Sequence, residues 1–174
     1  MAVLATISRD TQKGFSGICK FLIASTNDVS VGYDVSSGEV SFVSDSSLPT
    51  VFFSWTPTKE TSSFSSPLTG NPQAGTAVFL HTVNMVFART ETVKRNQLQV
   101  AAKDQELIVV AIERNGQAWC LGGVDSCSSG LDATGGDFLS GAAGGDQNGM
   151  LLTLTGNFGY PPGIVTDASL AELQ

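Results

Sequence analysis

The chain has 174 residues and a mass of 18.1 kDa, a length that predicts one domain with room for a sizeable apolar core. Hydrophobic residues make up 41% of it, which excludes a disordered chain, and only 14% are charged, against about 25% in an average domain. The formal net charge of −7 argues against binding of nucleic acid through its phosphates and against docking on an anionic membrane.

Cysteine usage and the N-terminus favour a cytoplasmic site of synthesis. The three widely spread cysteines, Cys19, Cys120 and Cys127, form a poor disulfide framework, so we expect reduced thiols. Arg9 and Lys13 stand where a signal peptide would have its apolar segment, and no apolar run reaches the length of a membrane helix. We expect a protein that stays soluble or assembles where it is made.

The chain begins with a predicted arm and a hairpin. Residues 1–14 are polar and mixed, and residues 15–24 form a compact apolar segment that predicts the first strand of the β domain. Residues 29–35 and 39–43 alternate apolar and polar side chains on either side of the turn sequence Ser36-Ser37-Gly38. This pattern predicts a β-hairpin with one apolar face.

A loop and a long strand follow. Residues 51–56 predict a strand that ends at Pro57, and residues 58–75 are so rich in Ser, Thr, Pro and Gly that they predict a long loop. Residues 76–90 predict one long strand whose two faces are both largely apolar. Such a strand is expected to be covered on both sides or to lie in a contact between subunits.

Residues 91–105 carry the one convincing helix pattern. Thr90 is placed to cap it, Glu91 lies at the positive end of its dipole, and Lys103 lies near the negative end. The side chains expected to pack on a sheet are Leu98, Ala101 and Ala102. The basic pair Lys94-Arg95 fits an ordinary solvated helix face.

The next segments predict a second hairpin. Residues 106–112 read as a buried strand and residues 117–121 as its return strand. Asn115-Gly116 between them is the strongest hairpin signal in the chain.

The remaining chain predicts a long loop, a last strand and a second arm. Residues 122–149 are rich in Gly, Asp and Ser and too long for a passive connector. Residues 150–156 predict the last strand, and residues 157–174 a C-terminal arm. The expected fold is therefore mainly β (α+β): an antiparallel β-sandwich or barrel over residues 15–156, with one flanking helix and extended arms.

No pattern in the sequence supports catalysis. The single histidine, His81, lies within an apolar strand and fits a satisfied core or interface residue better than a catalytic base. No nucleophile elbow, P-loop or dinucleotide fingerprint is present. The best metal candidate is the aspartate-rich loop with Asp125, Asp132, Asp137 and Asp146, but it lacks the spacing of a calcium motif. We expect neither an enzyme, nor a cofactor, nor a metal site.

The low content of charged residues also bears on assembly. Interface cores are depleted in charge, so a surface made of Ser, Thr, Gly, Gln and Asn suits extensive burial in an assembly. A β protein with an ordinary Ser/Thr surface is the alternative.

The order of segments resembles a family of structural proteins of tailed phages and prophages, of the Bacteroidetes type. The matching stretches, which together cover most of residues 13–165, are KGFSGICKFLIASTNDV, GEVSFV, FFSWTPTKETSSFSSPL, TVKRNQLQVAAKDQELIVVAIERNGQAWCLGG and GGDQNGMLLTLTGNFGYPP. Within this family the chain is most like a tail tube (major tail) protein. Residues 120–130 depart from the family pattern in their Cys and Ser content.

The resemblance implies a tail-tube-like fold and a role in the virion. It implies rings, commonly of six subunits, whose inner sheets join into a barrel around a channel for genome DNA, with the arms and long loops linking stacked rings. The implied partners are further copies of the chain, other tail proteins, and DNA that passes without specific binding; no membrane is implied. The implied location is the virion, assembled in the host cytoplasm.

Two carboxylates of the 29–43 hairpin are the predicted channel-facing groups. Asp34 and Glu39 lie on its polar face, which has no Lys or Arg, and a ring of them would repel DNA. An outer, solvated hairpin is the alternative. Alternative functions are another virion component, such as a tail terminator, head–tail connector or capsid decoration protein, or a ligand-binding β-sandwich.

Overall fold

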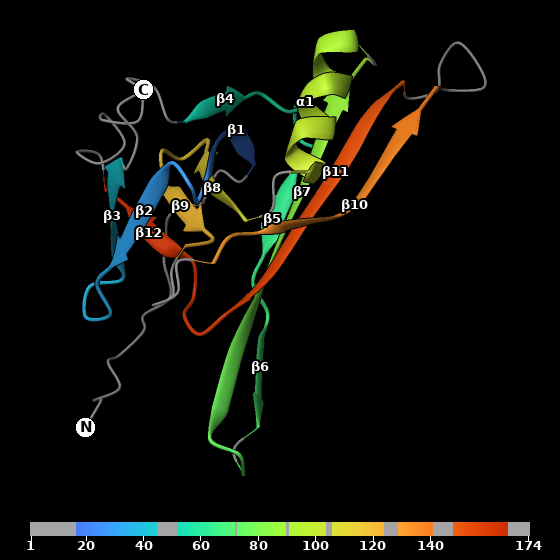
Figure 1. Cartoon of the computed structure of the whole chain (residues 1–174). Coiled ribbons are helices and arrows are strands. Elements are labelled where there is room, and N and C mark those ends of the chain that lie inside the picture. The colour runs from blue at the N-terminus through green and yellow to red at the C-terminus, as the bar shows by residue number, and fades with distance from the viewer. Residues whose placement is uncertain are drawn as a thin grey trace.

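The computed structural model describes residues 17–44, 52–71, 73–89, 91–103, 106–123, 129–140 and 148–166. Over these ranges the protein is mainly β, as predicted, and consists of two curled sheets packed face to face with one helix beside them (Figure 1). We call the larger layer sheet A and the smaller layer sheet B.

Sheet A has seven strands in the order β2-β3-β12-β9-β8-β1-β4. Their bounds are β1 Ile18–Ser25, β2 Val29–Tyr33, β3 Glu39–Ser44, β4 Phe53–Trp55, β8 Leu107–Glu113, β9 Ala118–Leu121 and β12 Gly163–Val165. All neighbours are antiparallel except β12 and β3, which run parallel. The short turns between β2 and β3 and between β8 and β9 explain the antiparallel order.

Sheet B is built on two long strands. Its order is β10-β11-β7-β5, with β6 also pairing with β7. The bounds are β5 Ser63–Ser65, β6 Leu68–Asn71, β7 Thr76–Ala88, β10 Asp132–Leu139 and β11 Gly149–Phe158. The β7–β11 ladder runs without a break from Phe79 opposite Phe158 to Ala88 opposite Gly149.

The apolar core lies between the two sheets. Strand β8 contributes the most, because its side chains from Leu107 to Ala111 are buried on both faces of sheet A. Sheet B contributes one face only, in which buried residues alternate with half-buried ones along β7 and β11. Those buried residues are His81, Val83, Met85, Phe87, Met150, Leu152, Leu154 and Phe158.

Helix α1, Thr92–Lys103, covers the upper end of this core (Figure 1). Leu98 and Ala101 are buried, as predicted, but Ala102 is exposed, because 100° per residue turns it toward solvent. Lys103 lies in the last turn, where its charge complements the helix dipole. Glu91 precedes the helix, and Thr90 lies outside the described residues.

Both predicted hairpins are present. Gly38, with φ +75°, closes the β2–β3 turn, and Gly116, with φ +89°, closes the β8–β9 turn. Val29, Val31 and Val40 are buried, which confirms the apolar face of the 29–43 hairpin.

The predicted loop over 58–75 is wrong at 63–65 and at 68–71. Strands β5 and β6 both pair with β7 there, and β6 is exposed along its whole length. Their Ser, Thr and Gly residues give no hydrophobic signal because backbone pairing, not burial, holds these strands in place.

The predicted loop over 122–149 and the arm over 157–174 also need correction. Strand β10 occupies 132–139, and its four consecutive exposed polar or glycine residues, Thr134 to Asp137, hide the alternation expected of a strand. Strand β11 extends to Phe158, and β12 lies inside sheet A with Val165 buried, so residues 157–165 belong to the domain rather than to an arm. The N-terminal arm, residues 1–14, lies outside the described residues.

The described residues form twelve strands, against about eight predicted, and one helix. Among them no helix has the length and apolar character needed to cross a membrane.

Candidate assembly surface

The second face of sheet B is not covered by any described strand or helix. Sheet A and α1 pack on the first face, where the core residues lie. On the second face the cross-strand rows are Ser63–Asn84–Thr153, Ser65–Thr82–Thr155–Asp132 and Val86–Leu151–Asp137. In the part of the chain that the structure describes, no strand or helix packs on these rows, and we call them the open face.

The open face is polar but almost uncharged. Thr153 Oγ1 donates to Asn84 Oδ1 at 2.9 Å, and Thr155 Oγ1 bonds Thr134 Oγ1 at 3.1 Å. These bonds join neighbouring strands and use hydroxyl groups and an amide oxygen that would otherwise be available to bind a ligand. The charges in the described rows are two carboxylates, Asp132 and Asp137, and no Lys or Arg accompanies them. Anions therefore meet repulsion on this face rather than a binding site.

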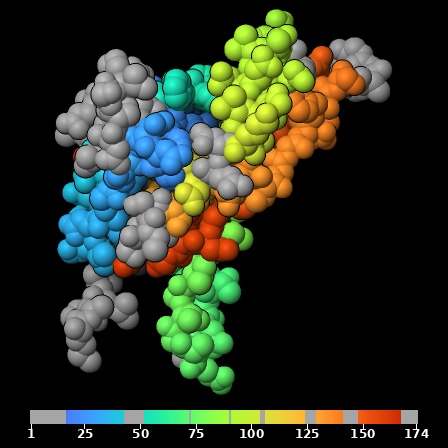
Figure 2. Space-filling view, viewed as in Figure 1, coloured from blue at the N-terminus to red at the C-terminus, as the bar shows by residue number. Residues whose placement is uncertain are grey.

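A two-stranded hairpin projects from the body below the open face. It consists of β6 and the first residues of β7, and Figure 2 shows it standing clear of the rest of the molecule. Leu68 is 59% exposed, and Val78 and Leu80 are each 38% exposed. No Asp, Glu, Lys or Arg occurs from Thr61 to Ala88. Isolated two-stranded hairpins are marginally stable in water, and no described strand or helix covers this one beyond its continuation into sheet B.

Sheet B ends in strands without outer partners. Within the described ranges, β10 pairs with β11 alone, and β5 and β6 pair with β7 alone. Strand β10 also exposes two apolar side chains, Phe138 at 50% and Leu139 at 38%. Exposed strand edges of this kind are templates for pairing with another chain.

Asp34 and Glu39 lie in the other layer, at the β2–β3 end of sheet A. Asp34 follows the end of β2, and its Oδ1 accepts hydrogen bonds from the backbone N–H and the hydroxyl of Ser36, at 2.9 and 2.7 Å. Those bonds and one from Ser37 lower the pKa of Asp34, so the carboxyl stays ionised well into the acid range. Both residues are exposed, beside a shallow hollow of about 430 Å³ that Tyr33 also lines.

Tyr33 is held in place by a second aromatic ring. Its ring centroid lies 5.1 Å from that of Tyr160, with the planes tilted by 34°. Burial raises the pKa of Tyr33, and the neighbouring Tyr160 and Asp34 add to the rise, so its hydroxyl stays protonated at neutral pH. This end of the molecule is therefore a small aromatic patch with carboxylates at its rim.

His81 is a core residue, and its environment is unlike that of a general base. It is fully buried at the level where the hairpin leaves the body, with its ring centroid 4.6 Å from that of Phe158. Burial lowers the pKa of His81 to about 4, although the backbone of Tyr160 opposes part of that change. Neither ring nitrogen makes a hydrogen bond of good geometry within the described residues, so this histidine is buried but not satisfied.

The other candidate residues, the aspartates and cysteines, do not lie together in the part of the chain that the structure describes. Asp132 and Asp137 are spread along β10, whereas Asp125 and Asp146 lie outside the described ranges, so the metal prediction stays a prediction. Cys120 is buried, and that burial raises the pKa of its thiol; Cys19 is exposed, and Cys127 is not described.

A groove of about 270 Å³ lies between α1 and β4. Trp55, Phe87, Leu98 and Met150 make its lining largely apolar. Its one cation, Lys94, is already engaged, since Nζ donates to the Ala88 carbonyl at 2.8 Å and lies 3.5 Å from Glu91. The described residues that line the groove include no His, Cys, Asp or Glu.

Comparisons of the chain with protein-family models, with curated proteins and with solved structures gave no match. The functional reading therefore depends on the geometry above and on the sequence resemblance. The sequence analysis does not predict the open face, because it places two of its strands, β5 and β10, in loops. The sequence feature that marks this face is the long uncharged run that ends at Ala88.

Proposed function

We propose that the chain is a tail tube subunit of a phage virion, a non-catalytic protein that assembles with its own copies into stacked rings around a channel for DNA. The observation that carries the proposal is the open face of sheet B. It combines hydroxyl and amide side chains with two carboxylates and has no cation in its described rows. A wall of this kind lets a polyanion slide, because it offers no phosphate-binding group.

The unpaired edges of sheet B support closure into a ring. Pairing of β10 in one copy with β5 and β6 in the next would continue the sheet and remove both edges. A continued sheet that curls on itself places one face inside, and the open face is the one without a covering layer.

The projecting hairpin supports stacking. Its uncharged sequence and its exposed Leu68, Val78 and Leu80 have no cover in the described part of the chain. Contact with a copy in the adjacent ring would bury these side chains. Charge depletion is what the core of such an interface requires.

The open face also replaces the β2–β3 hairpin as the proposed channel wall. Asp34 and Glu39 lie in the layer that contains sheet A, whereas Asp132 and Asp137 lie on the uncovered side of sheet B. Ring closure through sheet B leaves Asp34 and Glu39 outside the channel.

Electron microscopy of the purified full chain over a range of concentrations tests the proposal. We expect tubes or stacked rings. Single closed rings would favour a terminator, connector or decoration protein instead, and monomers at every concentration would favour a ligand-binding β-sandwich and overturn the proposal.

A charge reversal on the open face tests the channel wall. The double variant Asp132→Lys with Asp137→Lys should still assemble but retain short DNA duplexes in a salt-sensitive manner, since each added lysine provides a phosphate contact. The matched control, Asp28→Lys with Glu113→Lys, makes the same charge change at strand ends of sheet A, away from the open face, and should retain none. Equal DNA retention by the two variants would show that the open face does not line the channel.

A further inference from the structure

The outer flank of α1 carries cations that have no partner. Arg95 lies about 160° around the helix from Val93 and Gln97, which line the groove, so it faces away from β4. Lys103 is exposed in the last turn. Within the described ranges neither side chain lies at ion-pair distance from a carboxylate, and Arg95 makes only a long 3.4 Å bond to Asn96.

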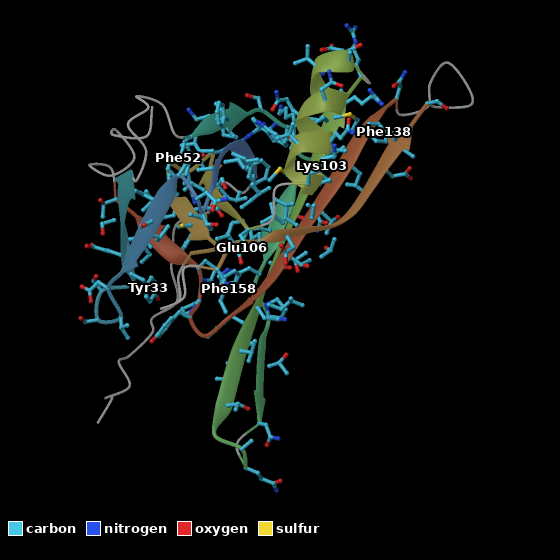
Figure 3. The ribbon with its side chains drawn as sticks, in the orientation of Figure 1. Tyr33, Phe52, Lys103, Glu106, Phe138 and Phe158 are labelled. Carbon is cyan, nitrogen blue, oxygen red and sulfur yellow. The ribbon has the colours of Figure 1, made fainter. Side chains whose placement is uncertain are left out.

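This cationic flank adjoins exposed apolar surface. Phe138 of β10 lies opposite Met150 in the sheet and is half exposed beside α1 (Figure 3). The two elements are in contact. We call Arg95, Lys103 and Phe138 the basic flank.

The opposite end of the molecule has the complementary character. From Thr26 to Phe42 the sequence contains three acids, Asp28, Asp34 and Glu39, and no Lys or Arg. Val35, at the tip of the β2–β3 turn, is 66% exposed. The turn is rigid, because Asp34 accepts bonds from Ser36 and Ser37 and Gly38 N–H donates to the Asp34 carbonyl at 2.7 Å. We call Asp34, Val35 and Glu39 the acidic turn.

The two surfaces lie at opposite ends of the molecule (Figure 3). Sheet A begins at β2 and ends at β4, and α1 follows β4 across the groove. In Figure 3, Tyr33 marks the end with the acidic turn, while Lys103 and Phe138 mark the other end. A contact between opposite ends of identical molecules is heterologous, so it repeats from copy to copy and closes into a ring when the rotation allows.

We propose that the basic flank is a docking surface for the acidic turn of a second copy of this chain. Arg95 and Lys103 meet Asp34 and Glu39, and Phe138 meets Val35. The inference rests on the proposed self-assembly and adds the lateral contact in the outer layer, which accompanies the joining of sheet B edges in the inner layer.

Charge reversal tests the contact. Glu39→Lys and Arg95→Glu each turn attraction into repulsion, so each alone should raise the protein concentration at half-assembly roughly tenfold or more. The matched controls, Glu113→Lys and Lys59→Glu, change the same charges elsewhere and should assemble as the wild type does. Both reversed residues are exposed, so circular dichroism should show unchanged folds.

Mixing the two reversed variants is the sharper measurement. In an alternating ring, the native Arg95 of one variant meets the native Glu39 of the other, and the lysine introduced at position 39 meets the glutamate introduced at position 95. The equimolar mixture, and the double variant that carries both changes, should therefore recover most of the wild-type assembly, while each variant alone stays weak.

Each outcome decides a different point. If the single reversals assemble like the wild type, or if mixing restores nothing, the contact is wrong although the self-assembly proposal stands. If the wild type does not assemble at any concentration, the proposed function and this contact both fall.

Discussion

Strand β8 and the lower part of β7 are similar in sequence and opposite in environment. The apolar residues of β8, from Leu107 to Ala111, are buried within the domain. The segment Thr76–Leu80 of β7 is almost entirely exposed, yet it also contains no charge and includes Val78, Phe79 and Leu80. Burial within the chain explains the absence of charge from Leu107 to Ala111 of β8, and it does not explain the absence of charge from Thr76 to Leu80 of β7.

The difference supports the proposal that the hairpin is a contact surface for a further copy of the chain. A solvated strand tolerates and usually carries Lys, Glu or Thr, because charge protects an exposed edge from unwanted pairing. The hairpin lacks that protection along its whole length. Its composition is therefore that of a surface buried between molecules.

Removal of a core aromatic side chain should have the largest effect on stability. Phe21 of β1 is fully buried, so Phe21→Ala should lower the free energy of unfolding by about 3–5 kcal/mol. The matched variant Phe53→Ala, in the neighbouring strand β4, removes a ring that is 63% exposed and should cost less than about 1 kcal/mol. Urea unfolding of both variants measures this, and similar losses would contradict the burial difference.

Acid should lower the stability of the fold, because His81 binds a proton more readily in the unfolded chain. The pKa of this histidine is lowered from 6.5 to about 4, so the unfolded chain takes up the proton first. Stability is then undiminished above pH 6.5 and falls by about 3 kcal/mol in total as the pH drops through 6.5 toward 4.

The variant His81→Phe isolates this contribution. Its ring can keep the contact with Phe158 and cannot titrate, so between pH 6.5 and 4.5 its urea midpoint should change less than that of the wild type. Parallel curves for the two proteins would mean that His81 is charged or solvated in the folded state.

The same glycine substitution should differ between a turn in sheet A and the tip of the hairpin. Gly116 and Gly75 have φ values of +89° and +64°, and an added Cβ meets no atom within 4 Å at either. Both alanine variants are strained by about 1–2 kcal/mol. Gly116→Ala should lower global stability by that amount, whereas Gly75→Ala should barely change it, because the tip can open without unfolding the core.

Polar replacement on the hairpin should have the smallest effect on the monomer. Leu68→Ser changes a side chain that is 59% exposed, so the unfolding free energy should change by less than about 0.5 kcal/mol. The same variant should weaken assembly, as sedimentation at a fixed concentration would reveal. A variant that assembles normally would show that the hairpin is not a contact surface.

Apolar alternation predicted most of sheet A and the long strands of sheet B. Val29, Val31 and Val40 gave the β2–β3 hairpin its face, and Asn115-Gly116 marked the β8–β9 turn correctly. Strands β5, β6 and β10 were not predictable in this way. Their Ser, Thr, Gly and Asp residues are held by backbone pairing with β7 or β11, and no local pattern records a partner that is distant in sequence.

The sequence predicted the residue types of the candidate surface but not its location in the fold. Carboxylates without cations were expected along a polar strand face, and Asp34 and Glu39 matched that description in sequence. The sheet that contains Asp34 and Glu39 could not be inferred, because local sequence does not determine which sheet a strand joins. Asp132 and Asp137 share an uncovered face only after β10 is recognised as a strand.

The position of β12 in sheet A makes the attachment of the β2–β3 hairpin depend on a strand that lies late in the chain. Among the described strands, β3 reaches the rest of sheet A only through β12, which lies far later in the chain. In a nascent chain the β2–β3 hairpin therefore cannot pair with the rest of sheet A until β12 has been synthesised. Ile164 N–H, which donates to the Gly38 carbonyl at 2.7 Å, then fixes the base of the turn. Chains that end before β12 lack this support for the acidic turn, so we expect them to compete poorly with full-length copies in the proposed ring.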